Sequence, residues 1–339
     1  MIGWLINLND ASRLTSINEA SRISGISAKA IEKDWWVTLS LKLLFNSPYA
    51  RHFAFKGGTS LSKGWQLIDR FSEDIDISLS SEAVNIEYVE KPSKTFVEQL
   101  RRAGCFFTSN ELMEALKAEF RNSQVPEILY SIEAESVRSD MPDTDPQTLY
   151  VNFISLFDPK PYLPDRVKIE FSVRSLKEPS IKRGMRSLLV THFPNENYIE
   201  ENCEILTIQP QRTLIEKMLL LHEEYNRDER GKMRTARMSR HYYDLFQLGR
   251  QDFSSATLKD NDFIEEIIEH RKYYSRLKRF DYSTLKRGSI RIIPSDDVLK
   301  ALEQDYEIMR AEMIYGHPPT FEEIIQSMKN LQDEINSEI

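Results

Sequence analysis

The sequence of 339 residues predicts an α+β fold, with a mixed β-sheet in the first half of the chain and helices in the second. Segments with an apolar residue at every second position lie before residue 175, whereas apolar residues spaced at three and four dominate beyond Pro210. We therefore expect a core with N-terminal helices over residues 1–205 and a C-terminal helical domain over residues 206–339.

Residues 11–46 are predicted to be helical. The segment Ser16-Ile17-Asn18-Glu19 is typical of a helix start, because a Ser side chain and a Glu three residues later can cap each other. A second helix is expected to open at Ser27, with an apolar stripe that recurs every four residues: Ile31, Trp35, Leu39 and Leu43.

The next part of the chain has the order strand, glycine turn, helix. Phe53-Ala54-Phe55 is a short apolar run, Gly57 and Gly58 permit a tight turn, and residues 60–69 show helical spacing. Period two returns over residues 71–79, where apolar side chains alternate with Asp74, Asp76 and Ser78. This pattern predicts a half-buried strand with carboxylates on its open face.

The remaining segments follow from the same periodicities and from turn residues. Residues 81–122 are expected to be mostly helical and residues 136–147 to form a loop. Strands are predicted at 149–157 and 166–174, and helices at 212–225, 239–249, 263–277, 295–314 and 321–338.

The composition is that of an ordinary globular protein, with 40% hydrophobic and 29% charged residues. Cys105 and Cys203 stand far apart, which argues against a zinc site or a disulfide scaffold and favours a reducing compartment. Since the sequence lacks a secretion leader and a long apolar run, we expect a cytoplasmic protein with no membrane partner. The net charge of −8 argues against indiscriminate binding to nucleic acid.

Asp74 and Asp76 are candidate metal ligands. Two positions apart on one strand, their Cα atoms would be about 6.6 Å apart and their carboxylates would share a face. Hard oxygen ligands of this kind suit Mg²⁺ or Mn²⁺, which would complete its shell with water and phosphate oxygens. Glu170, on the polar face of a later predicted strand, is the candidate third carboxylate.

The glycine turn is a candidate phosphate site. Gly57 and Gly58 allow close approach of the backbone to an anion, and Thr59 and Ser60 add hydroxyl donors. A cation is needed to neutralise the charge of the pyrophosphate leaving group, and Lys217 is the candidate. Residues that flank these segments are also expected to contact the nucleotide: Lys56, Arg70 and Ser72. The combination predicts a metal-dependent nucleotidyltransferase.

Two of these segments resemble the first motif of the AbiEii/AbiGii-type nucleotidyltransferase toxins: Phe55-Lys56-Gly57-Gly58-Thr59-Ser60-Leu61 and Arg70-Phe71-Ser72-Glu73-Asp74-Ile75-Asp76-Ile77. Four further segments are similar to other parts of that family, so that the resemblance spans residues 28–250: Glu32-Lys33-Asp34-Trp35-Trp36-Val37, Val167-Lys168-Ile169-Glu170, Arg212 to Lys217, and Ser239 to Leu245.

The resemblance implies a polymerase-β-like core in which Asp74 and Asp76 bind metal, Glu170 is a further acidic site residue, and Lys217 and Asp244 form an essential pair that reaches the nucleotide. It further implies a toxin with a separate antitoxin partner. Such a toxin would transfer a nucleotide from an NTP to RNA, in particular to the 3′ end of tRNA, and so block translation.

Two basic segments are candidate RNA contacts, at residues 227–240 and 271–291, the second interleaved with aromatic residues. A solvated helix face explains the same pattern equally well. His241 is expected to have a packing role. Two other functions stay open for the same fold: nucleotidylation of a protein target, and NTP binding without turnover by a regulator.

Overall fold

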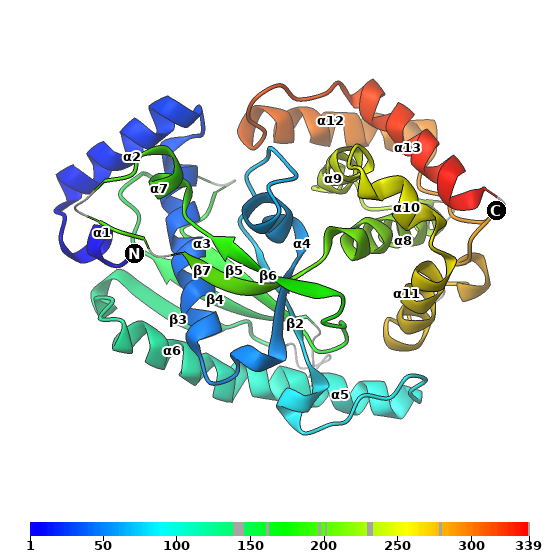
Figure 1. Cartoon of the computed structure of the whole chain (residues 1–339), viewed down its shortest axis with the longest axis horizontal. Helices are drawn as coiled ribbons and strands as arrows, with labels where there is room; N and C mark the ends of the chain where they lie inside the picture. The colour runs from blue at the N-terminus through cyan, green and yellow to red at the C-terminus, as the bar shows by residue number, and fades with distance from the viewer. Residues whose placement is uncertain are drawn as a thin grey trace. The chain divides into compact units, whose positions relative to one another are not determined.

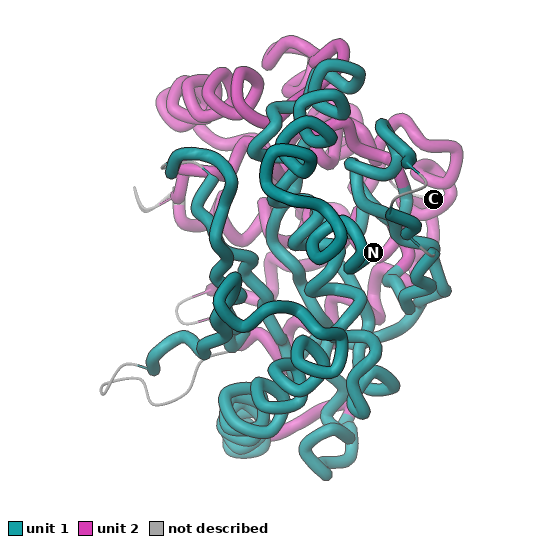
Figure 2. Tube along the Cα trace, turned by 90° about the vertical axis from the view of Figure 1, so that its left-hand side faces the viewer, with its two compact units in different colours: residues 1–65, 71–89, 94–208 teal, residues 66–70, 90–93, 209–339 magenta. Residues whose placement is uncertain are grey.

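A computed structural model describes residues 1–137, 146–160, 163–195, 198–200, 202–228, 233–277 and 280–337. The chain forms two compact units, coloured separately in Figure 2. The first comprises Met1–Trp65, Phe71–Val89 and Lys94–Ile208, and the second comprises Gln66–Arg70, Glu90–Ser93 and Gln209–Ile339. Two short segments from the first half of the sequence thus belong to the second unit.

The first unit is built on a mixed sheet of seven strands in the described residues, in the order β3-β4-β5-β2-β1-β7-β6. β2 is parallel to β5 and β1 is parallel to β7, while the other neighbours are antiparallel. The bounds are β1 Phe53–Lys56, β2 Ile75–Leu79, β3 Tyr130–Ala134, β4 Gln147–Phe153, β5 Arg166–Ser172, β6 Ser180–Met185 and β7 Cys203–Ile208. The predicted α+β architecture with a mixed sheet is confirmed (Figure 1).

The helix α3 (Ala28–Asn46) forms much of the core of this unit. It begins after Ser27, whose side chain accepts a hydrogen bond from the amide of Ala30, as expected of an N-cap. Trp36 is buried and stacks on Phe153 of β4, and α3 packs against β5 and β7. The other helices of the unit are α1 Gly3–Ile6, α2 Asp10–Ser24, α4 Gly57–Thr59, α5 Lys94–Phe107, α6 Met113–Asn122 and α7 Leu188–His192.

Short helical turns complete the first unit: η1 Ala50–His52, η2 Ser60–Gly64, η3 Ser81–Val84, η4 Thr108–Leu112 and η5 Glu127–Leu129. The second unit is helical in its described residues, with α8 Pro210–Asp228, α9 Ser239–Gly249, α10 Phe253–Lys259, α11 Asn261–Tyr274, η6 Tyr282–Thr284, α12 Asp296–Glu312 and α13 Phe321–Asn336. α9 packs against α8, α12 and α13, which places its polar residues inside the helical unit.

The predicted helix start at Ser16 is wrong. α2 begins at Asp10, where the side chain of Asn9 accepts from the amide of Ser12. Ser16 is instead buried inside the helix, where its hydroxyl accepts a hydrogen bond from Nε1 of Trp4. The local pattern of a helix cap does not reveal this role, because the partner of Ser16 is the tertiary neighbour Trp4.

The predicted helix over residues 60–69 is shorter than expected and ends at Gly64. Gln66 adopts a φ of +54°, a left-handed conformation that cannot continue the helix. The strand expected from residue 71 begins only at Ile75. Periodicity also missed β3, β6, β7 and α10, and residues 138–145 of the predicted loop lie outside the described residues.

Candidate active site

Asp76 and the glycine turn lie together. In the register of the sheet, Asp76 of β2 is opposite Lys56 of β1 on one side and Glu170 of β5 on the other. Gly57 has a φ of +78°, and a Cβ atom there would lie 2.0 Å from Oδ2 of Asp76. Only glycine therefore permits this conformation and this close approach to the carboxylate.

The hydroxyls of the turn stabilise the turn itself. Thr59 Oγ1 is 2.9 Å from Ser72 Oγ and donates to the carbonyl of Asp74 at 2.5 Å. Ser60 Oγ donates to the carbonyl of Gly57 at 2.9 Å. Both hydroxyl-bearing residues of the turn are fully buried. These contacts join the glycine turn to the segment that carries Asp74, within one unit of the structure.

Lys56 ends β1 directly before the glycine turn, and Gly58 follows within α4. Lys56 Nζ donates to Ser175 Oγ at 2.6 Å, and the carbonyl of Ser175 accepts from the hydroxyl of Ser78 at 2.8 Å. Lys56 is therefore directed toward the loop that follows β5.

Lys168 is a site residue that the sequence did not single out. Its Nζ lies 3.0 Å from Oε1 of Glu170, two positions along the same face of β5. Burial alone would lower the pKa of Lys168, but the carboxylates of Glu170 and Asp74 more than offset this and raise it. The alternation of Lys168 with apolar neighbours placed it on the Glu170 face, so the signal was present in the sequence.

Carboxylate oxygens are the ligands that a hard cation prefers, although three of these carboxylates do not converge on one point in the structure. Among the residues that the structure describes, no group of three His, Cys, Asp or Glu side chains converges closely enough to hold a metal ion. Glu170 is paired with Lys168, which already places a positive charge against it. Asp74 and Asp76 would suffice, because Mg²⁺ is often held by two carboxylates with water and substrate phosphates.

Asp244 is the centre of a charged cluster in the second unit. Arg70 donates through Nε and Nη2 to its two carboxylate oxygens at 2.7 and 2.9 Å, and Lys217 Nζ lies 3.0 Å from Oδ2. Burial would raise the pKa of Asp244, yet Arg70 and Lys217 hold it well below its usual range. The pairing of Lys217 with Asp244 implied by the family resemblance is present, and Arg70 joins it.

His241 contacts Lys217, with Nδ1 3.3 Å from Nζ. Burial, together with the nearby charge of Lys217, lowers the pKa of His241 well below its ordinary value, so the ring is neutral at pH 7. A neutral Nδ1 can accept a hydrogen bond from the ammonium group. His241 thus helps to fix Lys217, a role that its position next to two tyrosines in the sequence did not indicate.

Part of the basic segments is taken up by intramolecular ion pairs. Arg227 and Arg234 contact Glu224, and Arg271 is paired with Glu223. Of the other predicted RNA contacts, four residues lie outside the described residues: Arg230, Lys232, Lys278 and Arg279. The aromatic residues interleaved with the second segment include Tyr274, which is buried and stacks on His270.

The family model for "Nucleotidyl transferase AbiEii toxin, Type IV TA system" matches residues 41–327. The chain belongs to this family. It is therefore a nucleotidyltransferase of a type IV toxin–antitoxin system, which confirms the resemblance given by the sequence motifs and implies a cognate antitoxin. The range matched by the AbiEii model includes every predicted site residue, from Lys56 to Asp244.

Among solved structures, this AbiEii chain is similar to MenT4, a nucleotidyltransferase toxin from Mycobacterium tuberculosis H37Rv, with a TM-score of 0.45 and 15% sequence identity over 97% of this chain and 98% of that one. No curated protein gives a significant match. Within the described residues, no helix combines the length and the apolar character that crossing a membrane requires.

Proposed function

We propose that this AbiEii nucleotidyltransferase transfers a nucleotide from an NTP to an RNA acceptor, the 3′ end of tRNA, in the cytoplasm, and thereby blocks translation until its antitoxin neutralises it. The observation that carries the proposed site is the approach of Gly57 to Asp76, with Glu170 in register on the neighbouring strand. This arrangement combines a tight backbone turn and acidic side chains in one unit.

In the proposed reaction, a hydroxyl oxygen of the RNA end attacks the α-phosphorus of the NTP. The new P–O bond forms as the bond to the bridging oxygen of the β-phosphate breaks, and pyrophosphate leaves. The proton of the hydroxyl passes to a nearby carboxylate, such as Glu170. The roles of the chain are to orient the triphosphate, to hold the hydroxyl in line and to balance charge.

Asp74 and Asp76, joined by Glu170, would hold Mg²⁺ or Mn²⁺. When bound, such an ion stabilises negative charge on the phosphate oxygens. Gly57 and Gly58 let the backbone approach the triphosphate, with Lys56, Thr59, Ser60 and Ser72 forming its surroundings.

The charged cluster of the second unit supplies the proposed cation. Arg70 and Lys217 both contact the carboxylate of Asp244. We assign to Lys217 the neutralisation of phosphate charge, with Asp244 and His241 fixing its position. A cation in this position is what an anionic leaving group requires.

The test is transfer of label from each of four α-³²P-labelled NTPs to total tRNA in the presence of Mg²⁺. We expect labelled tRNA, and no label on tRNA whose 3′ diol has been destroyed by periodate. Chelation by EDTA and the variant Asp76→Asn should each remove the activity. Loss of an outer contact to a metal ligand costs about 10–100-fold, so loss of a direct ligand should cost at least as much.

Asp297→Asn is the matched control, because the Asp297 side chain is 99% exposed and the change in charge is the same. This variant should retain full activity. Label on protein instead of RNA would replace the proposal with protein nucleotidylation. Retention of NTP without transfer to RNA or protein would replace it with a binding regulator.

A further inference from the structure

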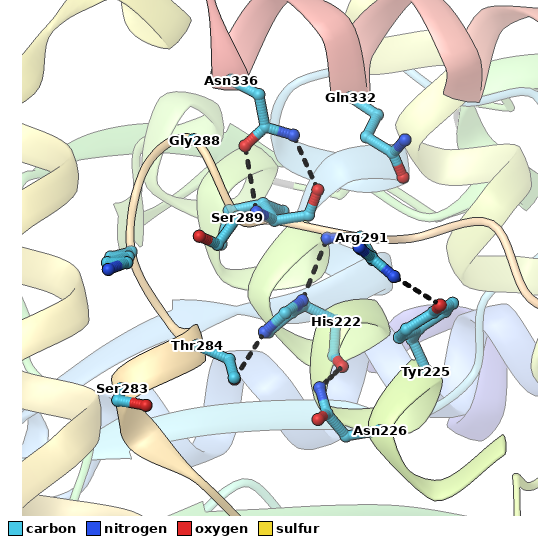
Figure 3. Close-up of a pocket in the computed structure, with 12 residues that line it drawn as sticks. His222, Tyr225, Asn226, Ser283, Thr284, Gly288, Ser289, Arg291, Gln332 and Asn336 are labelled. Carbon is cyan, nitrogen blue, oxygen red and sulfur yellow. Dashed lines mark hydrogen bonds between the residues drawn. The ribbon is translucent and has the colours of Figure 1, made fainter. Parts of the chain in front are cut away.

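The second unit contains a polar pocket of about 550 Å³ that plays no part in the proposed site. Residues of α8, of the segment 283–291 and of α13 line it (Figure 3). Neither Asp nor Glu occurs among the described residues of its lining. In a chain with a net charge of −8, a pocket whose charged lining residues, among those described, are the cations Lys286 and Arg291 calls for an explanation.

The wall of the pocket is fixed by hydrogen bonds from two helices. The amide of Arg291 donates to Nδ1 of His222 at 3.0 Å, and Nε2 of His222 lies 3.2 Å from Oγ1 of Thr284. From the other side, Asn336 of α13 accepts from the amide of Ile290 and donates to its carbonyl, at 2.9 and 2.7 Å. The backbone of the segment that carries the cations is thus fixed by side chains of α8 and α13, while Ile290 packs into the core.

Lys286 and Arg291 are the two cationic side chains of the lining, and both are exposed. Arg291 Nη1 donates to the hydroxyl of Tyr225 at 3.0 Å, and its guanidinium lies 5.7 Å from the centre of the Tyr225 ring. Figure 3 shows the Arg291 and Tyr225 side chains meeting at one side of the pocket. An arginine oriented in this way is suited to bind phosphate.

We propose that this pocket is a second binding site, which takes the phosphate of one nucleotide unit between Lys286 and Arg291. The volume of the pocket is within the range of about 300–1,000 Å³ typical of small-molecule sites. It is larger than a free phosphate needs. The amide of Asn226 and the hydroxyls of Ser283 and Ser289 provide polar partners for a sugar or a base.

Two sources offer the same chemistry: a phosphodiester of an RNA acceptor, or a free nucleotide. The RNA source rests on the function proposed above, and it is the one we favour, because both cations of the lining come from the basic and aromatic segment 271–291. An RNA unit bound there would help to select the acceptor, whereas a free nucleotide would be a regulator.

The experiment measures binding in EDTA, so that it does not depend on catalysis. Fluorescence anisotropy follows a labelled oligoribonucleotide, and calorimetry follows AMP and inorganic phosphate separately. The test variant is Lys286→Ala/Arg291→Ala, and the control is Lys300→Ala/Lys329→Ala, which removes two exposed cations of the same unit outside the pocket. Arg291→Lys tests the guanidinium with the charge retained.

We expect the pocket variant to bind the oligoribonucleotide at least tenfold more weakly, and the control to stay within twofold of the unaltered protein. Loss of AMP binding alone, with RNA binding unchanged, would support the pocket with a free nucleotide as its source. Equal losses in both double variants, or in neither, would overturn the proposal. Inorganic phosphate binding as tightly as AMP would overturn the nucleotide assignment.

The outcome is separable from that of the proposed function. If the unaltered protein transfers no label to RNA, the proposed function fails while the binding measurements still report on the pocket. If transfer is intact and the pocket variant binds normally, the pocket proposal alone fails.

Discussion

Gly57 is constrained both by its own backbone and by a neighbouring side chain. Its φ of +78° disfavours any residue with a Cβ, and the nearest atom that a Cβ would meet belongs to the carboxylate of Asp76. Gly25 shares the first constraint without the second, since it has a φ of +74° and open space around the Cβ position. The two glycines therefore separate backbone strain from displacement of the carboxylate.

We predict that Gly57→Ala abolishes nucleotide transfer while Gly25→Ala preserves it. Gly25→Ala should lower the free energy of unfolding by about 1 kcal/mol, since an L-residue is strained at positive φ, and Gly57→Ala should lower it by more, because its Cβ must also displace the Asp76 carboxylate. Urea unfolding and the labelled transfer assay measure the two effects. Equal activity in both variants would show that the contact with Asp76 is unimportant to the site.

Lys168 is predicted to compete with the metal ion for Glu170. Lys168 Nζ lies 3.0 Å from Glu170 Oε1, so an ion that uses Glu170 must displace it. Lys168→Met removes the competing charge and retains most of the side-chain volume. The Mg²⁺ concentration that gives half-maximal transfer should therefore fall. A rise in that concentration would instead indicate that Lys168 itself helps to hold the bound phosphate.

At the scale of elements, α3 holds the site segments through buried charges. Asp34 accepts from Lys63 Nζ, in the turn after the glycines, at 2.5 Å, and from the amide of Leu188, which opens α7, at 2.6 Å. Lys33 donates to the carbonyl of Pro164 at 2.9 Å and is paired with Glu73, the residue before Asp74. The motif that precedes the glycine turn in the sequence thus anchors the loops around the candidate site.

We predict that Lys33→Met destabilises the protein by about 3–5 kcal/mol, because it leaves the Glu73 carboxylate buried without its lysine. In the double variant Lys33→Met/Glu73→Leu the charge is gone as well, and much of the lost stability should return. Urea unfolding of the two variants is the measurement. A double variant no more stable than the single one would show that the ion pair is not the reason for the loss.

The cluster in α8 and α9 gives a prediction for pH. The pKa of Asp244 is held below its usual range, so the unfolded chain takes up a proton first as the pH falls. The stability from this group is therefore complete above about pH 4–5 and declines as the pH falls below about 4 toward the folded-state pKa.

Asp244→Asn should cost about 3–5 kcal/mol at pH 7, since two buried cations lose their carboxylate. The difference from the unaltered protein should narrow below about pH 4. Unfolding by urea at pH 7, 5 and 3 measures this, with the exposed Asp297→Asn as a control that should change the free energy of unfolding by less than about 1 kcal/mol at each pH. A gap that is constant with pH would exclude the ion pair as its cause.

At the scale of the whole molecule, the sequence predicts the architecture of the fold better than it predicts where individual helices and strands begin and end. Alternation placed Asp76 and Glu170 on polar strand faces, and the structure aligns them in register on parallel neighbouring strands. Short edge strands such as β6 were missed because their exposed, polar residues carry no apolar period. Periodicity reports only local sequence, whereas an edge strand such as β6 forms because it pairs with a neighbouring strand.

The site partners that the sequence missed are set by tertiary contacts. Arg70, a predicted nucleotide contact, donates to Asp244, which lies 174 positions away in the sequence. The contact of His241 with Lys217 joins two helices. The spacing of residues along the sequence does not predict contacts between residues that lie on different elements. Periodicity therefore predicts which face a residue occupies, and only the fold determines its partner.

Because the chain carries a net charge of −8, the salt dependence of RNA binding shows whether local cations hold the RNA. If RNA is held by local cations such as Lys286 and Arg291, its affinity must fall as salt rises, with a log–log slope of about −0.7 for each phosphate bound on a single strand. We expect a negative slope for the unaltered protein. Lys286→Ala/Arg291→Ala should reduce its magnitude by about 0.7 for each phosphate that the variant no longer binds, whereas Lys300→Ala/Lys329→Ala should keep it. Affinity independent of salt would mean that the acidic chain binds RNA without ionic contacts, and the pocket would lose its role in acceptor binding.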